Sequence, residues 1–468
     1  MADETTTARD DPAIRPFRDE NGDLDPAFVA AVEAALKADD ADEVKGHAGP
    51  LDPPDTADLI RALEPDLRPA LVRLLGGAFD FTALTDLDET ERVQLLGALP
   101  VETVARGVSE LESDDAVYLL EDLDTADQAA ILAEIPALER VTLERGLEYP
   151  EDSAGRRMQT DFIAVPPFWS VGQTIDYLRS AEDLPDDFYE VFVVDAAYRL
   201  VGTVALNRLL RAQRPVKIAE IMDEKQHTVR ATDDQEEVAR LFERYDLVST
   251  AVVDAAGRLV GVITVDDIVD VIQEEADEDM RLLGGVGDEE VSDTVLTTAR
   301  LRLPWLLVNM MTAFVAASVV AAFADTIKAL VTLAVLMPVN AALGGNAGTQ
   351  ALTVAVRALA TRDLRASNRG RVVLREIGVG LLNGVVLAAI AGTVAGLLFN
   401  NPLLGLVLAS AMVGTILFAT LLGILVPLTL ERVGVDPAVA SGVFVTTSTD
   451  VFGFFAFLGL ATLLIAFL

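Results

Sequence analysis

The strongest constraint on this chain is a division near Leu303 between an acidic part and an apolar part. Residues 303–468 contain only 6 acidic and 8 basic residues, a net charge of +2. Subtracting these from the 74 acidic and 36 basic residues of the whole chain leaves a net charge of −40 in residues 1–302. A long stretch with so few charges is typical of membrane-spanning helices, and the acidic part is expected to be soluble. Such an acidic surface would repel phosphate, so we expect no nucleic-acid partner.

Hydropathy predicts five membrane spans, each longer than the roughly 20 residues needed to cross the apolar core of a bilayer. Six arginines lie within residues 357–375, at the end of the second span and in the loop before the third, and Arg300 and Arg302 precede the first span. Because basic loops stay on the cytoplasmic side, we expect a plasma-membrane protein with its acidic part in the cytoplasm and Leu468 outside. The spans are predicted at residues 303–324, 329–359, 376–399, 403–430 and 438–467.

The first part of the soluble region carries a short helical repeat. Each copy has an apolar residue, an acidic turn that could cap a helix, and apolar residues at helical spacing. Repeats of about 12 residues predict stacked helices in an all-α superhelix, with an ordinary helical bundle as the alternative. We therefore expect a polar disordered tail over residues 1–24 and a helical-repeat domain over residues 25–149. The copies are LDPPDTADLIRAL (51–63), LDETERVQLLGAL (87–99), LESDDAVYLLEDL (111–123) and LDTADQAAILAEI (123–135).

A second duplication follows. VDAAYRLVG (194–202) and VDAAGRLVG (253–261) differ only at Tyr198 and Gly257, and each lies between two β-rich runs. Strand–turn–strand units with flanking helices resemble a pair of CBS domains, here about 150–215 and 216–276. The resemblance implies α/β folding and possible binding of ATP by a Ser/Thr-x-x-Asp motif, represented by Thr264 and Asp267. The alternative for these two residues is a strand end followed by a helix cap.

The run from Asp266 to Asp279 contains eight acidic residues and no basic residue. Asp267, Asp270, Glu274 and Glu278 fall on one helical face, where like charges repel. Bound divalent cations would offset this repulsion; the alternative is a solvated face screened by salt. The chain has no cysteine and only two histidines, so a bound metal needs oxygen ligands, which suit Mg²⁺, Ca²⁺ or Mn²⁺.

The second span contains Pro338 and the segment GGNAGTQ (344–350), which carries three glycines among polar side chains. We interpret it as an interrupted helix that lines an ion pathway, because broken backbone at membrane depth must be buried in protein or face a wet cavity. The alternative is close helix packing through glycine. In the third span, the pairs Gly380/Gly384 and Gly392/Gly396 are expected to be helix contacts only.

Asp450 is the most informative single residue. It lies well inside the last span, which contains no basic residue. A lone carboxylate at this depth costs at least a few kcal/mol, so it should face water, a partner or a cation. The alternative is a protonated acid hydrogen-bonded within the bundle. A pair of Asp450 side chains across the twofold axis of a homodimer could hold hydrated Mg²⁺ by outer-sphere contacts.

Taken in order, these parts resemble the MgtE family of magnesium channels. The resemblance rests on PEDSAGRRM (150–158), VDDIVDVIQEEADED (265–279), GGNAGTQ and DPAVASGVFVTTSTDVFGFF (436–455). It implies a homodimeric Mg²⁺ channel in the lipid bilayer, whose pore lies at the dimer interface between spans two and five. The implied pore residues are Asp450, Thr446, Thr449, Asn346, Gly344 and Gly345. The implied Mg²⁺-sensing residues are Asp267, Asp270, Glu275, Glu278, Asp279, Glu236, Asp246, Asp436, Asp114 and Asp115.

We expect cytosolic Mg²⁺ to close the channel by bringing the acidic domains together, with a linker helix over residues 277–302 shutting the pore domain of residues 303–468. When Mg²⁺ falls, repulsion between the acidic domains would separate them. Two other functions are open at this point: a membrane-anchored CBS nucleotide sensor, and a coupled transporter of Co²⁺ or Mn²⁺. We find no constellation of nucleophile and base, so an enzyme is not expected.

Overall fold

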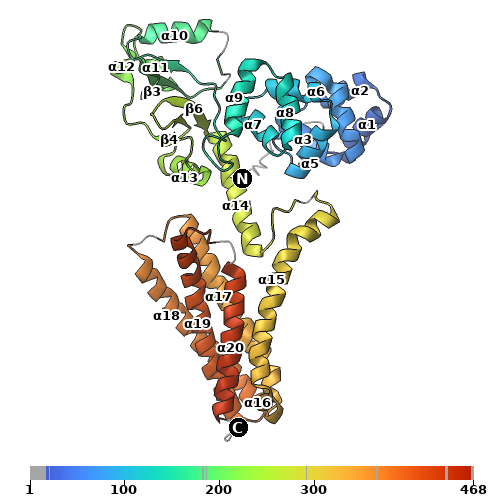
Figure 1. The fold of residues 1–468 in the computed structure, drawn as a ribbon, viewed down its shortest axis with the longest axis vertical. Helices are drawn as coiled ribbons and strands as arrows, with labels where there is room; N and C mark the ends of the chain where they lie inside the picture. Colours follow the sequence, from blue (N-terminus) through green and yellow to red (C-terminus); the bar gives the residue numbers. More distant parts are fainter. Residues whose placement is uncertain are drawn as a thin grey trace, which may run out of the picture. The chain divides into compact units, whose positions relative to one another are not determined.

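Figure 1 shows the fold of the computed structural model, which describes residues 17–19, 22–181, 184–185, 187–290, 292–364, 367–437 and 441–464. The chain divides into two compact units at Glu274 and Glu275, and we describe each unit by itself.

The first unit begins with helices only, which confirms the predicted all-α domain (Figure 1). Five consecutive helices start at Glu89, Val101, Ser113, Thr125 and Ala137, a constant step of 12 residues. Their apolar faces form one continuous core. The helices are α1 Pro26–Lys37, α2 Ala41–Ala48, α3 Pro53–Ala62, α4 Arg68–Leu75, α5 Glu89–Ala98, α6 Val101–Ser109, α7 Ser113–Glu121, α8 Thr125–Glu134 and α9 Ala137–Leu147, with short 3-10 turns Pro65–Leu67, Gly76–Ala78 and Phe81–Leu84.

The predicted disordered tail is wrong at its C-terminal end. Arg18 and Leu24 form an isolated β-bridge, and the Arg18 guanidinium pairs with the carboxylates of Asp55 and Asp58 on α3. This arginine compensates Asp55, which is almost fully buried. Residues 1–16, 20 and 21 lie outside the described part of the chain.

The rest of the first unit confirms the predicted duplication. Two three-stranded sheets, ordered β1-β2-β3 and β4-β5-β6, each combine one parallel and one antiparallel pair with a register shift at the same place. The strands are β1 Ala164–Val165, β2 Glu190–Val194, β3 Leu200–Ala205, β4 Thr228–Arg230, β5 Ser249–Val253 and β6 Leu259–Thr264. The helices are α10 Val171–Ser180, α11 Leu206–Arg211, α12 Ile218–Ile221, α13 Gln235–Tyr245 and α14 Val265–Gly284, which runs on into the second unit.

The one difference between the two duplicated segments falls at the hairpin turn. Tyr198 has φ +63° and Gly257 has φ +76°, so both occupy the left-handed region. Only glycine enters this region without steric cost. The second repeat therefore has the residue that the turn favours, whereas the first holds an exposed tyrosine in a strained conformation.

The second unit holds the long apolar helices. They are α15 Val295–Ala322, α17 Thr332–Ala360, α18 Arg369–Leu398, α19 Pro402–Val433 and α20 Ser441–Leu464, with a short α16 Ala324–Ala329. Each of the five long helices overlaps one predicted span, and residues 438–440 and 465–467 of the last span lie outside the described part. Four of them, α15, α18, α19 and α20, are long and apolar enough to cross a membrane; α17 is as long but more polar.

Helix α19 is the centre of this unit and packs against α17, α18 and α20. Two predicted glycine pairs make the expected helix contacts. A Cβ built on Gly380 would lie 2.8 Å from Thr420 Oγ1, and one on Gly392 would lie 2.7 Å from the Gly405 carbonyl oxygen. Glycine at these positions therefore allows α18 to approach α19 closely.

The predicted linker helix over residues 277–302 is not a single helix. Helix α14 ends at Gly284, and Gly285 follows with φ +67°, a left-handed residue that stops a helix. Helix α15 starts at Val295, where the Thr294 hydroxyl accepts a hydrogen bond from the Thr297 amide. The segment thus comprises the end of α14, a non-helical connection and the first turns of α15.

Candidate ion pathway and cation-sensing site

Asp450 lies near the middle of α20 and is half-buried within a single chain. Helix α20 contains no basic residue, and no hydrogen bond or ion pair to Asp450 is present among the described residues. Thr446, one turn earlier, is exposed, whereas Thr449 is fully buried and donates its hydroxyl proton to the Thr446 carbonyl. Among the described residues, the Asp450 carboxyl group therefore has neither a counter-charge nor the hydrogen bond that the alternative of a protonated acid would need.

Helix α17 corrects the prediction of an interrupted second span. It is continuous from Thr332 to Ala360, with Pro338 inside it and GGNAGTQ fully helical. Gly344 and Gly348 face the neighbouring helices: added Cβ atoms would lie 2.6 Å from Thr415 Cγ2 and 2.7 Å from Val445 Cγ1. Gly344 and Gly348 thus allow close helix packing, as the alternative interpretation held, and the GGNAGTQ segment does not interrupt the helix.

The polar side chains of α17 divide between two environments. Asn340 is buried and joins three helices, since its amide nitrogen donates to Thr415 Oγ1 on α19 at 3.2 Å and to the Gly453 carbonyl on α20 at 3.0 Å. Asn346 and Gln350 are instead exposed, and Gly345 is half-buried. Polar side chains on an uncovered helix face at membrane depth require water, an ion or another protein chain.

In the first unit, acidic residues of α7 face acidic residues of α14. Asp115 lies within electrostatic reach of Asp266, Asp267 and Asp270, and burial together with this repulsion raises its pKa to about 7. Burial, opposed by a hydrogen bond from Thr264, raises the pKa of Asp267 to about 6. We call the following set the acidic cluster: Glu112, Asp114, Asp115, Asp266, Asp267 and Asp270.

The acidic cluster brings together four predicted sensing residues and two that the sequence analysis missed, Glu112 and Asp266. Asp114 is the most buried member; burial raises its pKa, and its Oδ1 atom has no hydrogen-bond partner among the described residues. Raised carboxyl pKa values mean that ionised side chains are unfavourable in this arrangement without a counter-charge. Glu112 and Asp266 each lie within two residues of a predicted acid, which is the only signal that the sequence offers for them.

This cluster is a region of negative charge and not a finished coordination shell. Within the described ranges, no three carboxylate or imidazole side chains are close enough together to ligate one metal ion directly. Since Mg²⁺ gives up its water molecules reluctantly, a hydrated ion held through its waters suits such a region.

The other predicted sensing acids are distributed along α13, α14 and the end of α19. Glu236 lies in the first turn of α13 and forms an ion pair with Arg240. Asp246 is exposed at the end of the same helix, and Asp436 is exposed after α19. Glu275, Glu278 and Asp279 lie on α14 in the second unit.

The predicted nucleotide motif occupies the junction of β6 and α14. The Thr264 hydroxyl donates to Asp267 Oδ2 at 2.7 Å, as expected of a strand end followed by a helix cap. The adjoining cavity has a volume of about 20 Å³ and is lined by Asp161, Asp187 and Glu190 among others. In the described residues the Thr264 and Asp267 side chains thus bond to each other, and binding of ATP by this motif stays a prediction.

Comparisons with known proteins find matches in both units of the chain. Three family models match: "Divalent cation transporter" over residues 337–460, "MgtE intracellular N domain" over residues 51–152 and "CBS domain" over residues 218–274. The chain is 34% identical to the magnesium transporter MgtE of Thermus thermophilus, over 94% of this chain and 99% of the relative. It is 31% identical to the magnesium transporter MgtE of Bacillus subtilis, over 76% of this chain and 79% of the relative.

The chain is also similar to one solved structure described as the cytosolic domain of the Mg²⁺ channel MgtE in complex with ATP. The identity is 32%, the match covers 52% of this chain and 99% of that one, and the TM-score is 0.48.

Proposed function

Because the chain belongs to the MgtE family of magnesium transporters, we propose that it carries Mg²⁺ across the plasma membrane and is closed by cytosolic Mg²⁺. The observation that carries this proposal is Asp450, an uncompensated carboxylate in a helix without basic residues. Its surroundings support a role in transport, since the neighbouring α17 presents the polar side chains of Asn346 and Gln350 on an uncovered face.

The pathway is proposed to form where α17 and α20 of two chains meet across a twofold axis. Two copies of Asp450 would then face each other and attract a hydrated divalent ion without stripping its water. Symmetry also explains why a single chain leaves these polar groups uncovered. In this arrangement both domains of the first unit lie in the cytoplasm, and the C-terminus lies outside.

The acidic cluster is proposed to sense cytosolic Mg²⁺. Ions between α7 and α14 neutralise carboxylates that otherwise repel one another, which favours the compact arrangement of the first unit. Without Mg²⁺ the cluster destabilises that arrangement, and the population shifts towards a separated, conducting state.

The proposal is tested by flux into liposomes that contain the purified protein. We expect Mg²⁺ entry down its gradient, independent of a proton gradient, and closure when millimolar Mg²⁺ is present on the cytoplasmic side. The measurement is a Mg²⁺-sensitive dye inside the vesicles, with Ca²⁺, Mn²⁺ and Co²⁺ as competitors. Entry that requires a proton gradient would favour a coupled transporter, and the absence of any flux would favour a nucleotide sensor.

The raised pKa values of the acidic cluster predict that acid favours the compact arrangement. Asp115 with a pKa of about 7 and Asp267 with a pKa of about 6 bind protons more tightly there than in separated domains, where the ordinary value is 3.8. The stabilisation by protons is therefore present at low pH and lost as the pH rises through 6 to 7. Between pH 8 and pH 6 we expect the compact fraction of metal-free protein to rise about tenfold relative to the open one.

This pH effect can be measured by protease protection of the purified protein in the presence of a chelator. Replacing Asp115 and Asp267 together by asparagine should remove most of the pH dependence. Equal protection of the wild-type protein at pH 6 and pH 8 would contradict the assignment of these carboxyls to the sensing cluster.

A further inference from the structure

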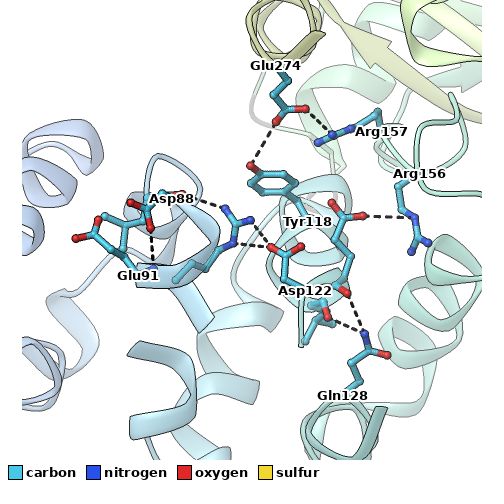
Figure 2. A network of polar contacts seen from close by, with 12 residues as sticks. Asp88, Glu91, Tyr118, Asp122, Gln128, Arg156, Arg157 and Glu274 are labelled. Atoms are coloured by element: carbon cyan, nitrogen blue, oxygen red, sulfur yellow. Dashed lines mark hydrogen bonds and ion pairs between the residues drawn. The ribbon is translucent and has the colours of Figure 1, made fainter. Parts of the chain in front are cut away.

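The helical-repeat domain and the CBS pair share a second set of contacts that involves no cluster of like charges. Its centre is Tyr118 on α7, shown in Figure 2. The guanidinium groups of Arg92 and Arg157 lie 4.2 Å and 5.1 Å from the centroid of the Tyr118 ring. The Tyr118 hydroxyl lies 3.3 Å from Glu274 Oε1, and Arg157 donates to Glu274 Oε2 at 2.6 Å. We call Arg92, Tyr118, Arg157 and Glu274 the Tyr118 latch.

Each guanidinium of the latch is fixed within its own domain. Arg92 is buried and donates from Nε to Asp122 at 3.1 Å and from Nη1 to the Leu87 carbonyl at 3.2 Å. Arg157 donates from Nε to Gln235 Oε1 on α13 at 3.0 Å. Arg92 and Tyr118 belong to one domain, and Arg157 is held in place by the other, so little side-chain freedom is lost when Tyr118 meets Arg157.

A neighbouring ion pair strengthens the same junction. Arg156 Nε lies 3.5 Å from Glu121 Oε2, and both side chains are largely buried. Burial raises the pKa of Glu121 to about 7 and also raises the pKa of Tyr118, so the tyrosine stays a neutral hydrogen-bond donor. Arg156 and Arg157 belong to the PEDSAGRRM segment, for which neither the pathway nor the acidic cluster provides a role.

The latch and the acidic cluster lie on the same two helices, one turn apart. On α7, Asp115 precedes Tyr118 by three residues; on α14, Asp270 precedes Glu274 by four. At the first turn the two helices present like charges, which repel without a cation. At the next turn Tyr118 on α7 meets Glu274 on α14, and the guanidinium groups of Arg92 and Arg157, which come from outside these two helices, supply positive charge, so these groups attract one another without a cation.

We propose that the Tyr118 latch is an autoinhibitory contact that holds α7 against α14 independently of Mg²⁺ and thereby sets the Mg²⁺ concentration at which the channel closes. This inference rests on the proposed function, in which the compact first unit is the closed state. The helical-repeat domain then pivots about the latch when Mg²⁺ leaves the cluster. Repulsion among the cluster carboxylates opposes closure, and bound Mg²⁺ has to offset it. Because the latch also stabilises the closed state, closure needs less bound Mg²⁺ than it would without the latch.

The test compares two variants that lose the same charge. Arg157→Ala removes one arm of the latch, whereas Arg214→Ala breaks the exposed Arg214–Asp176 pair elsewhere in the first unit. We expect Arg157→Ala to raise the Mg²⁺ concentration for half-closure about tenfold without changing flux at zero cytoplasmic Mg²⁺. The Arg214→Ala variant should keep the wild-type threshold.

A second measurement follows the domain contact without using transport. The chain has no cysteine, so Lys45→Cys on α2 and Leu210→Cys on α11 introduce two unique sites for fluorophores. In chelator, Arg157→Ala should lower the energy transfer between them, and Arg214→Ala should not. The charge exchange Arg157→Glu with Glu274→Arg restores the ion pair without the contact to the Tyr118 ring and should recover part of the wild-type threshold and transfer, which separates loss of the latch from loss of folding.

The results discriminate between the two proposals. Unchanged energy transfer and an unchanged threshold in Arg157→Ala would overturn the latch while leaving Mg²⁺ closure of the wild-type protein intact. Wild-type protein that ignores cytoplasmic Mg²⁺ would overturn the proposed sensing, and the energy-transfer comparison would still support or reject the latch. Tyr118→Phe, which keeps the ring and loses the hydroxyl, should shift the threshold by only about threefold.

Discussion

Replacement of Asp450 by asparagine or alanine is expected to abolish Mg²⁺ transport, with flux falling at least about a hundredfold. The carboxylate is the only acidic group of α20, and a charge at that depth is costly unless it meets a cation. Asparagine keeps the size and hydrogen bonding of the side chain but cannot attract a hydrated divalent ion. The measurement is dye-detected Mg²⁺ entry into liposomes at zero cytoplasmic Mg²⁺, where the sensing cluster does not close the channel.

A matched control is Thr393→Val on α18, whose hydroxyl donates to the Ala389 carbonyl within its own helix. This residue is outside the proposed pathway, so flux should remain at the wild-type level. Asp450→Glu retains the charge and should retain part of the flux. Mg²⁺ entry at the wild-type rate in Asp450→Asn would refute the assignment of α20 to the pathway.

Local patterns predicted four helices of the first unit and its duplicated strand–turn–strand segments. The acidic caps Asp88 and Asp124 precede α5 and α8 and marked their repeats in the sequence. Helices α6 and α9 have the same 12-residue step but follow Pro100 and Pro136, so their starts lacked the acidic signal. The period of the array was therefore predictable, whereas its full extent was not.

Helix α17 shows where reasoning from a single segment fails. Pro338 and three glycines would weaken an isolated helix, and this led to the prediction of a break. In the bundle, Gly344 and Gly348 allow α19 and α20 to approach closely, and this packing stabilises the continuous helix. That gain depends on which residues of other helices lie opposite, and the sequence of one span does not contain this information.

Glu274 shows the same limit for charges. Its helical spacing to Asp267 and Asp270 suggested one acidic face neutralised by metal. Its actual partner is Arg157, 117 residues earlier in the chain, so this carboxylate is neutralised by protein. The carboxylates that stay available to cations are those of the acidic cluster. They come from α14 and from Glu112, Asp114 and Asp115, and the fold of the first unit brings these segments together.

Replacement of Asp115 and Asp267 together by alanine is expected to leave the channel open at millimolar cytoplasmic Mg²⁺. The two residues belong to opposite helices, and both are half-buried in the compact arrangement. Their replacement removes one carboxylate from each of the two helices between which Mg²⁺ is proposed to bind. The remaining carboxylates of the acidic cluster still repel one another, namely Glu112, Asp114, Asp266 and Asp270. The compact state therefore loses the stabilisation by bound ions and keeps most of its electrostatic penalty. We expect the Mg²⁺ concentration for half-closure to rise at least tenfold in the liposome flux assay.

The matching asparagine pair separates two physical roles of these carboxylates. If they act mainly as ligands of a hydrated ion, Asp115→Asn with Asp267→Asn should also remain open, because an amide binds Mg²⁺ weakly. If they act only by mutual repulsion, neutral side chains should close the channel at a lower Mg²⁺ concentration than the wild-type protein needs. Closure of both double variants in the absence of Mg²⁺ would show that the cluster keeps the domains apart and does not bind the ion. The pathway through Asp450 would be untouched by that result, since it is tested at zero cytoplasmic Mg²⁺.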